Sequence, residues 1–146
     1  MRGVSGPTKT RLGLEDPKVN VRIKLAALWT AVMFCYIYAD YFDLYVPGML
    51  RSMQEGQGPI GPTTPETLLA ASFVLAIPSL MIFLSVALRP GVARWLNVGF
   101  GAAYTGIILF TMWSRAFLIF YGIIEITLTL LVIWYAWKWP KAESAD

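Results

Sequence analysis

The stretch that decides the fold is Thr67 to Leu88, TLLAASFVLAIPSLMIFLSVAL, which contains no charged residue. A helix crosses the hydrocarbon layer of a membrane, ~30 Å thick, with ~20 residues at ~1.5 Å each. A buried helix of a soluble protein matches such a composition only at shorter length. This segment therefore predicts a transmembrane helix.

Three further stretches are long and apolar enough to span a membrane: about Leu25 to Val46, Trp95 to Trp113 and Phe117 to Trp137. The chain has 146 residues, of which 57% are hydrophobic and 14% charged, against roughly 45 to 50% and 25% in soluble domains. We therefore expect an all-α integral membrane protein with one four-span domain over residues 19–140. A flexible basic arm (1–18) precedes this domain, and a short tail (141–146) follows it.

The connections between spans predict how the helices run. Arg89 to Gly91 and Trp113 to Arg115 leave room only for tight turns, so spans two, three and four should be antiparallel neighbours in an up-and-down bundle. The segment from Arg51 to Thr64 is rich in glycine and proline and is typical of a longer loop.

Two features inside the spans predict local geometry. Pro78 should kink the second span, with Ser79 available to satisfy freed backbone groups. Gly99, Ala103 and Gly106 give the third span a face of small residues, which is typical of close helix packing.

The distribution of lysine and arginine predicts the orientation, because cytoplasmic segments carry the excess of these residues. Only Arg51 and Arg115 fall on the side of the long loop. The others fall on the side of the termini: Arg2, Lys9, Arg11, Lys18, Arg22, Lys24, Arg89, Arg94, Lys138 and Lys141. Both termini are therefore predicted to be cytoplasmic. The net charge of +3 has the same explanation, and no basic segment interleaved with aromatic residues predicts a nucleic-acid partner.

Several kinds of chemistry lack their reagents in this sequence. Histidine is absent and Cys35 is the only cysteine. A disulfide framework, a Cys/His zinc site and histidine acid-base catalysis are therefore excluded, and the sequence predicts no metal site and no cofactor.

Three carboxylates lie inside predicted spans: Asp40, Asp43 and Glu125. An aspartate at the middle of a span costs about 2.5 to 3.5 kcal/mol, so such residues are rare unless they face a polar interior. Counted from the predicted outer side, Asp40 lies ~9 Å deep and Glu125 ~12 Å deep, which suggests one shared cavity. Asp43 lies only ~4 to 5 Å deep, and a solvated helix end is favoured for it over a ligand-binding role.

Aromatic residues accompany these acids at helical spacing. Trp29, Tyr36, Asp40 and Asp43 recur on one face of the first span. We therefore predict an outward-opening pocket with acids at its floor and aromatic walls. The residues expected to bind a proton or a ligand are Asp40, Glu125, Asp43, Tyr36, Tyr121, Trp29, Tyr104 and Arg115.

The segment LWTAVMFCYIYADYFDLYVPG (28–48), together with YGIIE (121–125) and WYAWKWP (134–140), resembles the signature of a family of small, uncharacterised bacterial membrane proteins. The resemblance extends from about Val19 to Pro140 and implies four spans in the inner membrane, with no assigned reaction. In general design the chain is also similar to small multidrug exporters, which have four short spans and a membrane-embedded acid beside aromatic residues in the first.

Three classes of function fit these features. The first is binding or transport of a proton, a cation or a small lipophilic cation at Asp40 and Glu125. The second is an accessory or structural subunit, whose acids only lock spans one and four together. The third is a membrane enzyme that acts on a lipophilic substrate with a carboxylic general acid. The sequence ranks them in that order, expects the lipid bilayer as a partner and leaves a homo-oligomer open.

Overall fold

The computed structural model describes residues 17–58 and 61–140. Within this part of the chain, four helices are long and apolar enough to cross a membrane: α1 (Val21–Asp43), α3 (Pro65–Ala87), α4 (Pro90–Thr111) and α5 (Ala116–Trp137). The predicted all-α, four-span fold is confirmed, with membrane insertion supported by length and composition. The predicted arm, apart from residues 17 and 18, and the predicted tail fall outside the described residues.

Short polar and proline signals set where the helices begin. The Asn20 side chain accepts a hydrogen bond from the Arg22 backbone N–H at 3.0 Å, so α1 begins four residues before the predicted span. Thr64 forms a capping box with Thr67 at the start of α3, and Pro65 occupies the first turn. Pro90 starts α4 in the same way, before the predicted boundary at Trp95.

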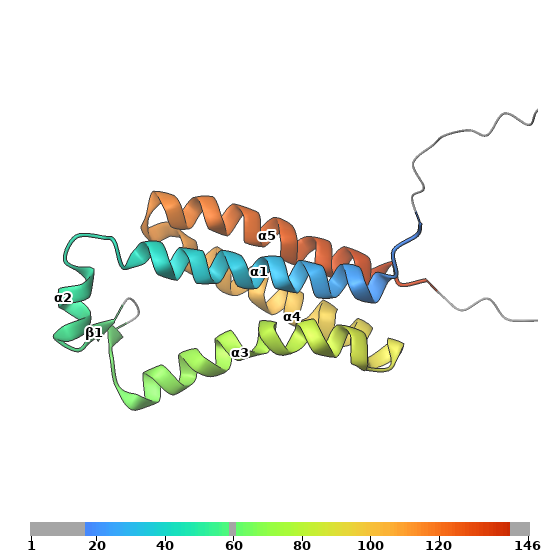
Figure 1. The fold of residues 1–146 in the computed structure, drawn as a ribbon, viewed down its shortest axis with the longest axis horizontal. Coiled ribbons are helices and arrows are strands. Elements are labelled where there is room, and N and C mark those ends of the chain that lie inside the picture. The colour runs from blue at the N-terminus through green and yellow to red at the C-terminus, as the bar shows by residue number, and fades with distance from the viewer. Residues whose placement is uncertain (1–16, 59–60, 141–146) are drawn as a thin grey trace, which may run out of the picture.

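The four helices run alternately up and down, and α1 lies between α3 and α5 (Figure 1). Helix α5 packs along both α1 and α4, whereas α3 packs on α1 and contacts α4 little. Spans two and three are therefore antiparallel as expected, but they contact each other much less than spans three and four do. We call the end that holds Val21, Ala87, Pro90 and Trp137 the terminal end, and the opposite end the loop end.

The loop end carries more structure than the predicted open loop. The short helix α2 (Met49–Gln54) is followed by the two-residue strands β1 (Gln57–Gly58) and β2 (Gly61–Pro62). The strands pair antiparallel, with Gln57 opposite Pro62 and Gly58 opposite Gly61. A 3-10 turn, η1 (Met112–Ser114), joins α4 to α5 at the same end.

Helix α3 bends near its middle (Figure 1), where Pro78 interrupts the helix. Proline has no N–H to donate to the carbonyl four residues earlier, which belongs to Val74. The Tyr104 hydroxyl of α4 donates to that carbonyl. The prediction that Ser79 would compensate for the kink was wrong, since its hydroxyl instead contacts the Met33 sulfur at 3.5 Å.

The bend divides α3 into two unlike halves. The buried residues of α3 are Pro78, Met81 and Ser85, all from the kink toward the terminal end. From Pro65 to Ala76, toward the loop end, every residue is exposed except the half-buried Ala71. Helix α3 therefore closes the bundle at the terminal half and leaves it open at the loop half.

Helices α4 and α5 are held close by a different glycine from those predicted. A side chain at Gly101 would place its Cβ atom 2.8 Å from Ile133 Cγ1, whereas Gly99 and Gly106 have no such neighbour within 4 Å. The close contact between α4 and α5 therefore lies at Gly101, on a different face of α4 from the predicted one. Thr105 joins α4 to Thr129 of α5 one turn later, with 2.8 Å between the hydroxyl oxygens.

Arginines complete two helix ends at the terminal end. The Arg22 Nη1 atom of α1 donates to the Val86 carbonyl in the last turn of α3 at 2.8 Å. The Arg94 Nη2 atom of α4 donates to the Trp137 carbonyl, the last of α5, at 3.2 Å. The final carbonyls of a helix have no partner within it, so a neighbouring cation stabilises the helix end.

Candidate functional site

Glu125 is the acid placed deepest in the bundle, and only 4% of its surface is exposed. It lies on the buried face of α5 with Gly122, Thr129 and Val132, at spacings of three and four residues. No hydrogen bond or ion pair reaches its carboxylate from the described residues. Glu125 is therefore a buried acid without a protein partner in the described part of the chain.

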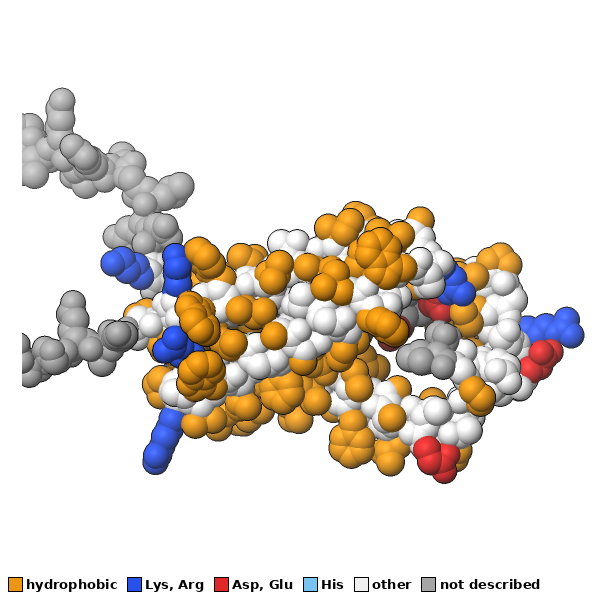
Figure 2. Space-filling view, turned by 180° about the vertical axis from the view of Figure 1, so that it is seen from behind, with side chains coloured by type: hydrophobic (Ala, Val, Ile, Leu, Met, Phe, Trp, Pro, Cys, Tyr) orange, Lys and Arg blue, Asp and Glu red, His pale blue; other side chains and the backbone are white. Residues whose placement is uncertain are grey.

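Asp40 approaches Glu125 from α1. The two carboxylates are close enough for their charges to interact, although the Asp40 residue is exposed whereas Glu125 is buried. Figure 2 shows a hollow between the loop half of α3 and the other helices, with acidic side chains at its edge. From Pro65 to Ala76, α3 is exposed except at Ala71, so this half of the helix covers little of the bundle beside it.

Two tyrosines lie in the same region. Tyr36, one turn before Asp40 on α1, has a buried hydroxyl that finds no hydrogen-bond partner among the described residues. Its ring lies 6.3 Å from the Tyr104 ring, measured between centroids. Tyr104 itself is 2% exposed and its hydroxyl is bound to the carbonyl freed by Pro78. Tyr36 therefore has a free polar group, and Tyr104 has none.

Asp43 differs from the interpretation that favoured a solvated helix end. It is buried, with 7% exposure, and forms an ion pair with Arg115, the residue before α5. The sequence placed Arg115 at the same end of the bundle as Asp43 but could not assign its partner. This pair joins the end of α1 to the start of α5 and leaves Arg115 engaged, so Arg115 does not pair with Glu125.

Trp29 was predicted to line the pocket, and this placement was wrong. Trp29 is fully buried in the terminal half of the core, and its Nε1 atom donates to Asn97 Oδ1 at 2.7 Å. The Ser85 hydroxyl donates to the same oxygen at 3.1 Å, and the Asn97 amide donates to the Ala93 carbonyl at 2.8 Å. Our sequence interpretation missed Asn97, although a side-chain amide inside an apolar span is itself a signal.

Comparison with known protein families identifies the family of this chain. A model described as a family of unknown function (DUF6326) matches residues 16–146. The chain belongs to DUF6326. The match covers all four spans and both acids of the pair, and it confirms the resemblance to a family without an assigned reaction. No curated protein and no solved structure matches the chain.

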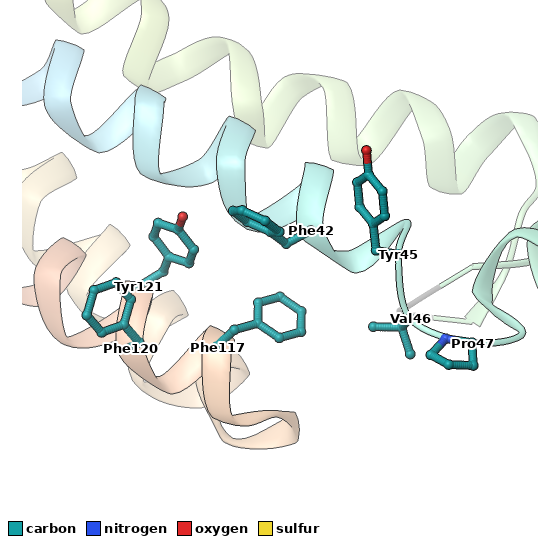
Figure 3. A pocket seen from close by; sticks show the side chains of 7 residues that line it. All are labelled: Phe42, Tyr45, Val46, Pro47, Phe117, Phe120 and Tyr121. Atoms are coloured by element: carbon teal, nitrogen blue, oxygen red, sulfur yellow. The ribbon is translucent and has the colours of Figure 1, made fainter.

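In this DUF6326 protein, a second hollow lies at the loop end and is aromatic (Figure 3). It is an open pocket of about 460 Å³ between the end of α1, the loop that follows and the start of α5. Phe42 stacks on Tyr121 across it, with 6.3 Å between ring centroids. Its lining contains no acid and consists of Phe42, Tyr45, Val46, Pro47, Phe117, Phe120 and Tyr121.

The residues predicted to line one pocket therefore do not all lie together. Tyr121 lines the aromatic pocket, whereas Asp40 and Glu125 do not. Within residues 17–58 and 61–140, no group of three or more His, Cys, Asp or Glu residues is arranged to hold a metal ion. The chemistry that the acid pair offers is proton or cation binding.

Proposed function

We propose that this membrane protein binds a proton or a small cation at the Glu125–Asp40 pair and moves it between the pair and the loop end. A small lipophilic cation is included, because aromatic rings at the loop end attract cations through their faces. On this proposal the termini lie in the cytoplasm of a bacterial cell and the acids open away from it.

The single observation that carries the proposal is the isolation of Glu125. A carboxylate removed from water is costly unless it is paired, hydrogen-bonded or neutralised. Glu125 has no partner among the described residues, and Arg115 is already bound to Asp43. A proton or a cation would neutralise Glu125, and the exposed Asp40 beside it offers a second ligand on the path to solvent.

The test uses purified protein in liposomes that contain the pH-sensitive dye pyranine. A potassium gradient with valinomycin makes the interior negative, and proton entry is read from the dye. Tetraphenylphosphonium uptake, followed with a selective electrode, is the arm for lipophilic cations. The wild type should move at least one of these probes faster than protein-free liposomes do.

The variant Glu125→Gln should abolish this flux because the amide keeps the shape but cannot exchange a proton. Glu66→Gln is the matched control, since Glu66 is exposed in the first turn of α3. The proposal fails if neither probe moves above the background, or if Glu125→Gln transports as the wild type does with an unchanged melting temperature.

A structural role is the second candidate, and the Asp43–Arg115 pair favours it. In that pair a buried acid at the end of α1 is bound to the residue before α5. If the acid pair were also only structural, Asp40→Asn and Glu125→Gln would lower the melting temperature and change no flux. An accessory subunit of this kind would need a partner protein, which co-purification from the native membrane would detect.

The orientation is tested by labelling single cysteines in a Cys35→Ala background. Lys138→Cys lies at the terminal end and Gln54→Cys in α2 at the loop end. With intact cells, a membrane-impermeant maleimide should label the cysteine in α2 and spare the one at position 138. Labelling only at position 138 would reverse the proposed orientation.

A further inference from the structure

The charges of the described residues are separated along the bundle. The terminal end is basic, and Figure 2 shows its blue side chains grouped there. All acids among residues 17–58 and 61–140 lie toward the opposite end: Asp40, Asp43, Glu55, Glu66 and Glu125. The basic residues at the terminal end are Lys18, Arg22, Lys24, Arg89, Arg94 and Lys138.

Arg94 contacts two aromatic rings and a helix carbonyl. Its guanidinium lies over two indole rings, 5.6 Å from the centroid of Trp95 and 5.7 Å from that of Trp137. Its Nη2 atom holds the Trp137 carbonyl at 3.2 Å, and its Nε atom is buried. The guanidinium is thus fixed in place by three contacts, and its Nη1 donors are not used by the described residues.

The two indoles that hold Arg94 are themselves exposed. Trp95 is 61% and Trp137 58% exposed, and their rings meet edge to face with 6.2 Å between centroids. Neither indole N–H donates to another of the described residues. Such rings at a span end lie at the level of the lipid head groups. Lys138, the residue after Trp137, adds a positive charge and lies over the Trp134 ring at 3.8 Å.

We propose that Arg94, Trp95, Trp137 and Lys138 form a binding site for an anionic phospholipid in the leaflet at the terminal end. Guanidinium groups match the oxygens of a phosphate, and basic pockets at span ends attract anionic head groups. Because Arg94 is already held against two rings and a carbonyl, binding costs less side-chain entropy than a free arginine would lose. The exposed indoles contact the glycerol and upper chain region, which a soluble phosphate lacks.

Native mass spectrometry of the whole protein in a neutral detergent tests this site. Dioleoylphosphatidylglycerol and dioleoylphosphatidylcholine are added in equal amounts. The wild type should retain the anionic lipid preferentially. Arg94→Gln should weaken that retention about fivefold, the effect of one basic residue near an anionic surface. Arg51→Gln, at the loop end, is the matched control and should bind as the wild type does.

A second variant separates binding from folding, because Arg94 also caps α5. The Lys138 side chain holds no helix carbonyl, so Lys138→Gln should weaken lipid retention without a change in melting temperature. Equal retention of the two lipids by the wild type would overturn the proposal, as would retention unchanged in both variants. Displacement of the lipid by excess glycerol phosphate would assign the site to a soluble phosphate and also overturn it.

Discussion

The terminal and loop halves of the bundle use similar polar residues in opposite ways. In the terminal half, Trp29, Ser85 and Asn97 satisfy one another in a closed core. In the loop half, Glu125 and the Tyr36 hydroxyl are buried and find no partner among the described residues. The difference arises because α3 covers the terminal half with its residues from Pro78 onward, whereas its residues before Pro78 leave the loop half largely uncovered. A polar group inside a membrane therefore indicates a site only when its neighbours leave it unpaired.

The largest expected effect breaks the ion pair between Arg115 and the buried Asp43. Arg115→Met leaves Asp43 buried without its partner, and unfolding by SDS in mixed micelles should become easier by about 2 to 3 kcal/mol. This lies below the ~3 to 5 kcal/mol of a fully buried pair because a third of the Arg115 side chain is exposed. The double variant Arg115→Met, Asp43→Asn should recover most of the loss. No recovery would mean that Arg115 acts through something other than Asp43.

The next effect probes how tightly α4 and α5 pack. Gly101→Val would force atoms against Ile133 and the Thr129 carbonyl, and overpacking of this kind costs about 1 to 3 kcal/mol. Gly99→Val is the matched control on the same helix, because nothing lies within 4 Å of its Cβ position. In the same unfolding titration, Gly101→Val should have a clearly lower free energy of unfolding than Gly99→Val. Equal free energies would contradict the close contact at Gly101.

We call the hydrogen-bonded cluster of Trp29, Ser85 and Asn97 in the terminal half the hub. A smaller effect is expected from breaking it. Asn97→Leu keeps the number and branching of the side-chain heavy atoms but leaves the Trp29 N–H without its acceptor. Hydrogen bonds between helices in membranes contribute about 0.6 kcal/mol on average and ~1.7 at most, so the loss of stability should lie near 1 kcal/mol. Gln54→Leu, at an exposed position in α2, should change stability little. An effect of Asn97→Leu no larger than that of Gln54→Leu would show that the hub is dispensable.

The smallest effect on stability should come from Glu125→Gln. An amide resembles the neutral, protonated acid that we propose, and Glu125 has no partner among the described residues to lose. The free energy of unfolding should therefore change by less than about 0.5 kcal/mol, the range of substitutions that disturb no contact. The measurement is the same titration, at neutral pH. A loss above that range would reveal a partner for Glu125 and remove the contrast between the halves.

The sequence predicted the elements of this fold because their signals are local. Long apolar runs mark the spans, and the short turns between the last three fix their up-and-down order. The similar depth of Asp40 and Glu125 stays a prediction. The sequence could not pair Asp43 with Arg115 or place Trp29 against Asn97, because these contacts depend on how whole helices rotate and slide relative to one another. The choice of Gly101 over Gly99 as the contact point has the same origin.

The arginines that complete the helix ends also bear on how the protein assembles. Membrane helices insert separately and associate afterwards. Until α1 lies beside α3, the Val86 carbonyl has only water or head groups to bind, and the same holds for Trp137 until α4 lies beside α5. Because α1 and α4 are synthesised before the helices they cap, each arginine is already at the membrane surface when its carbonyl emerges. Lateral association thus replaces these temporary partners with the two arginines.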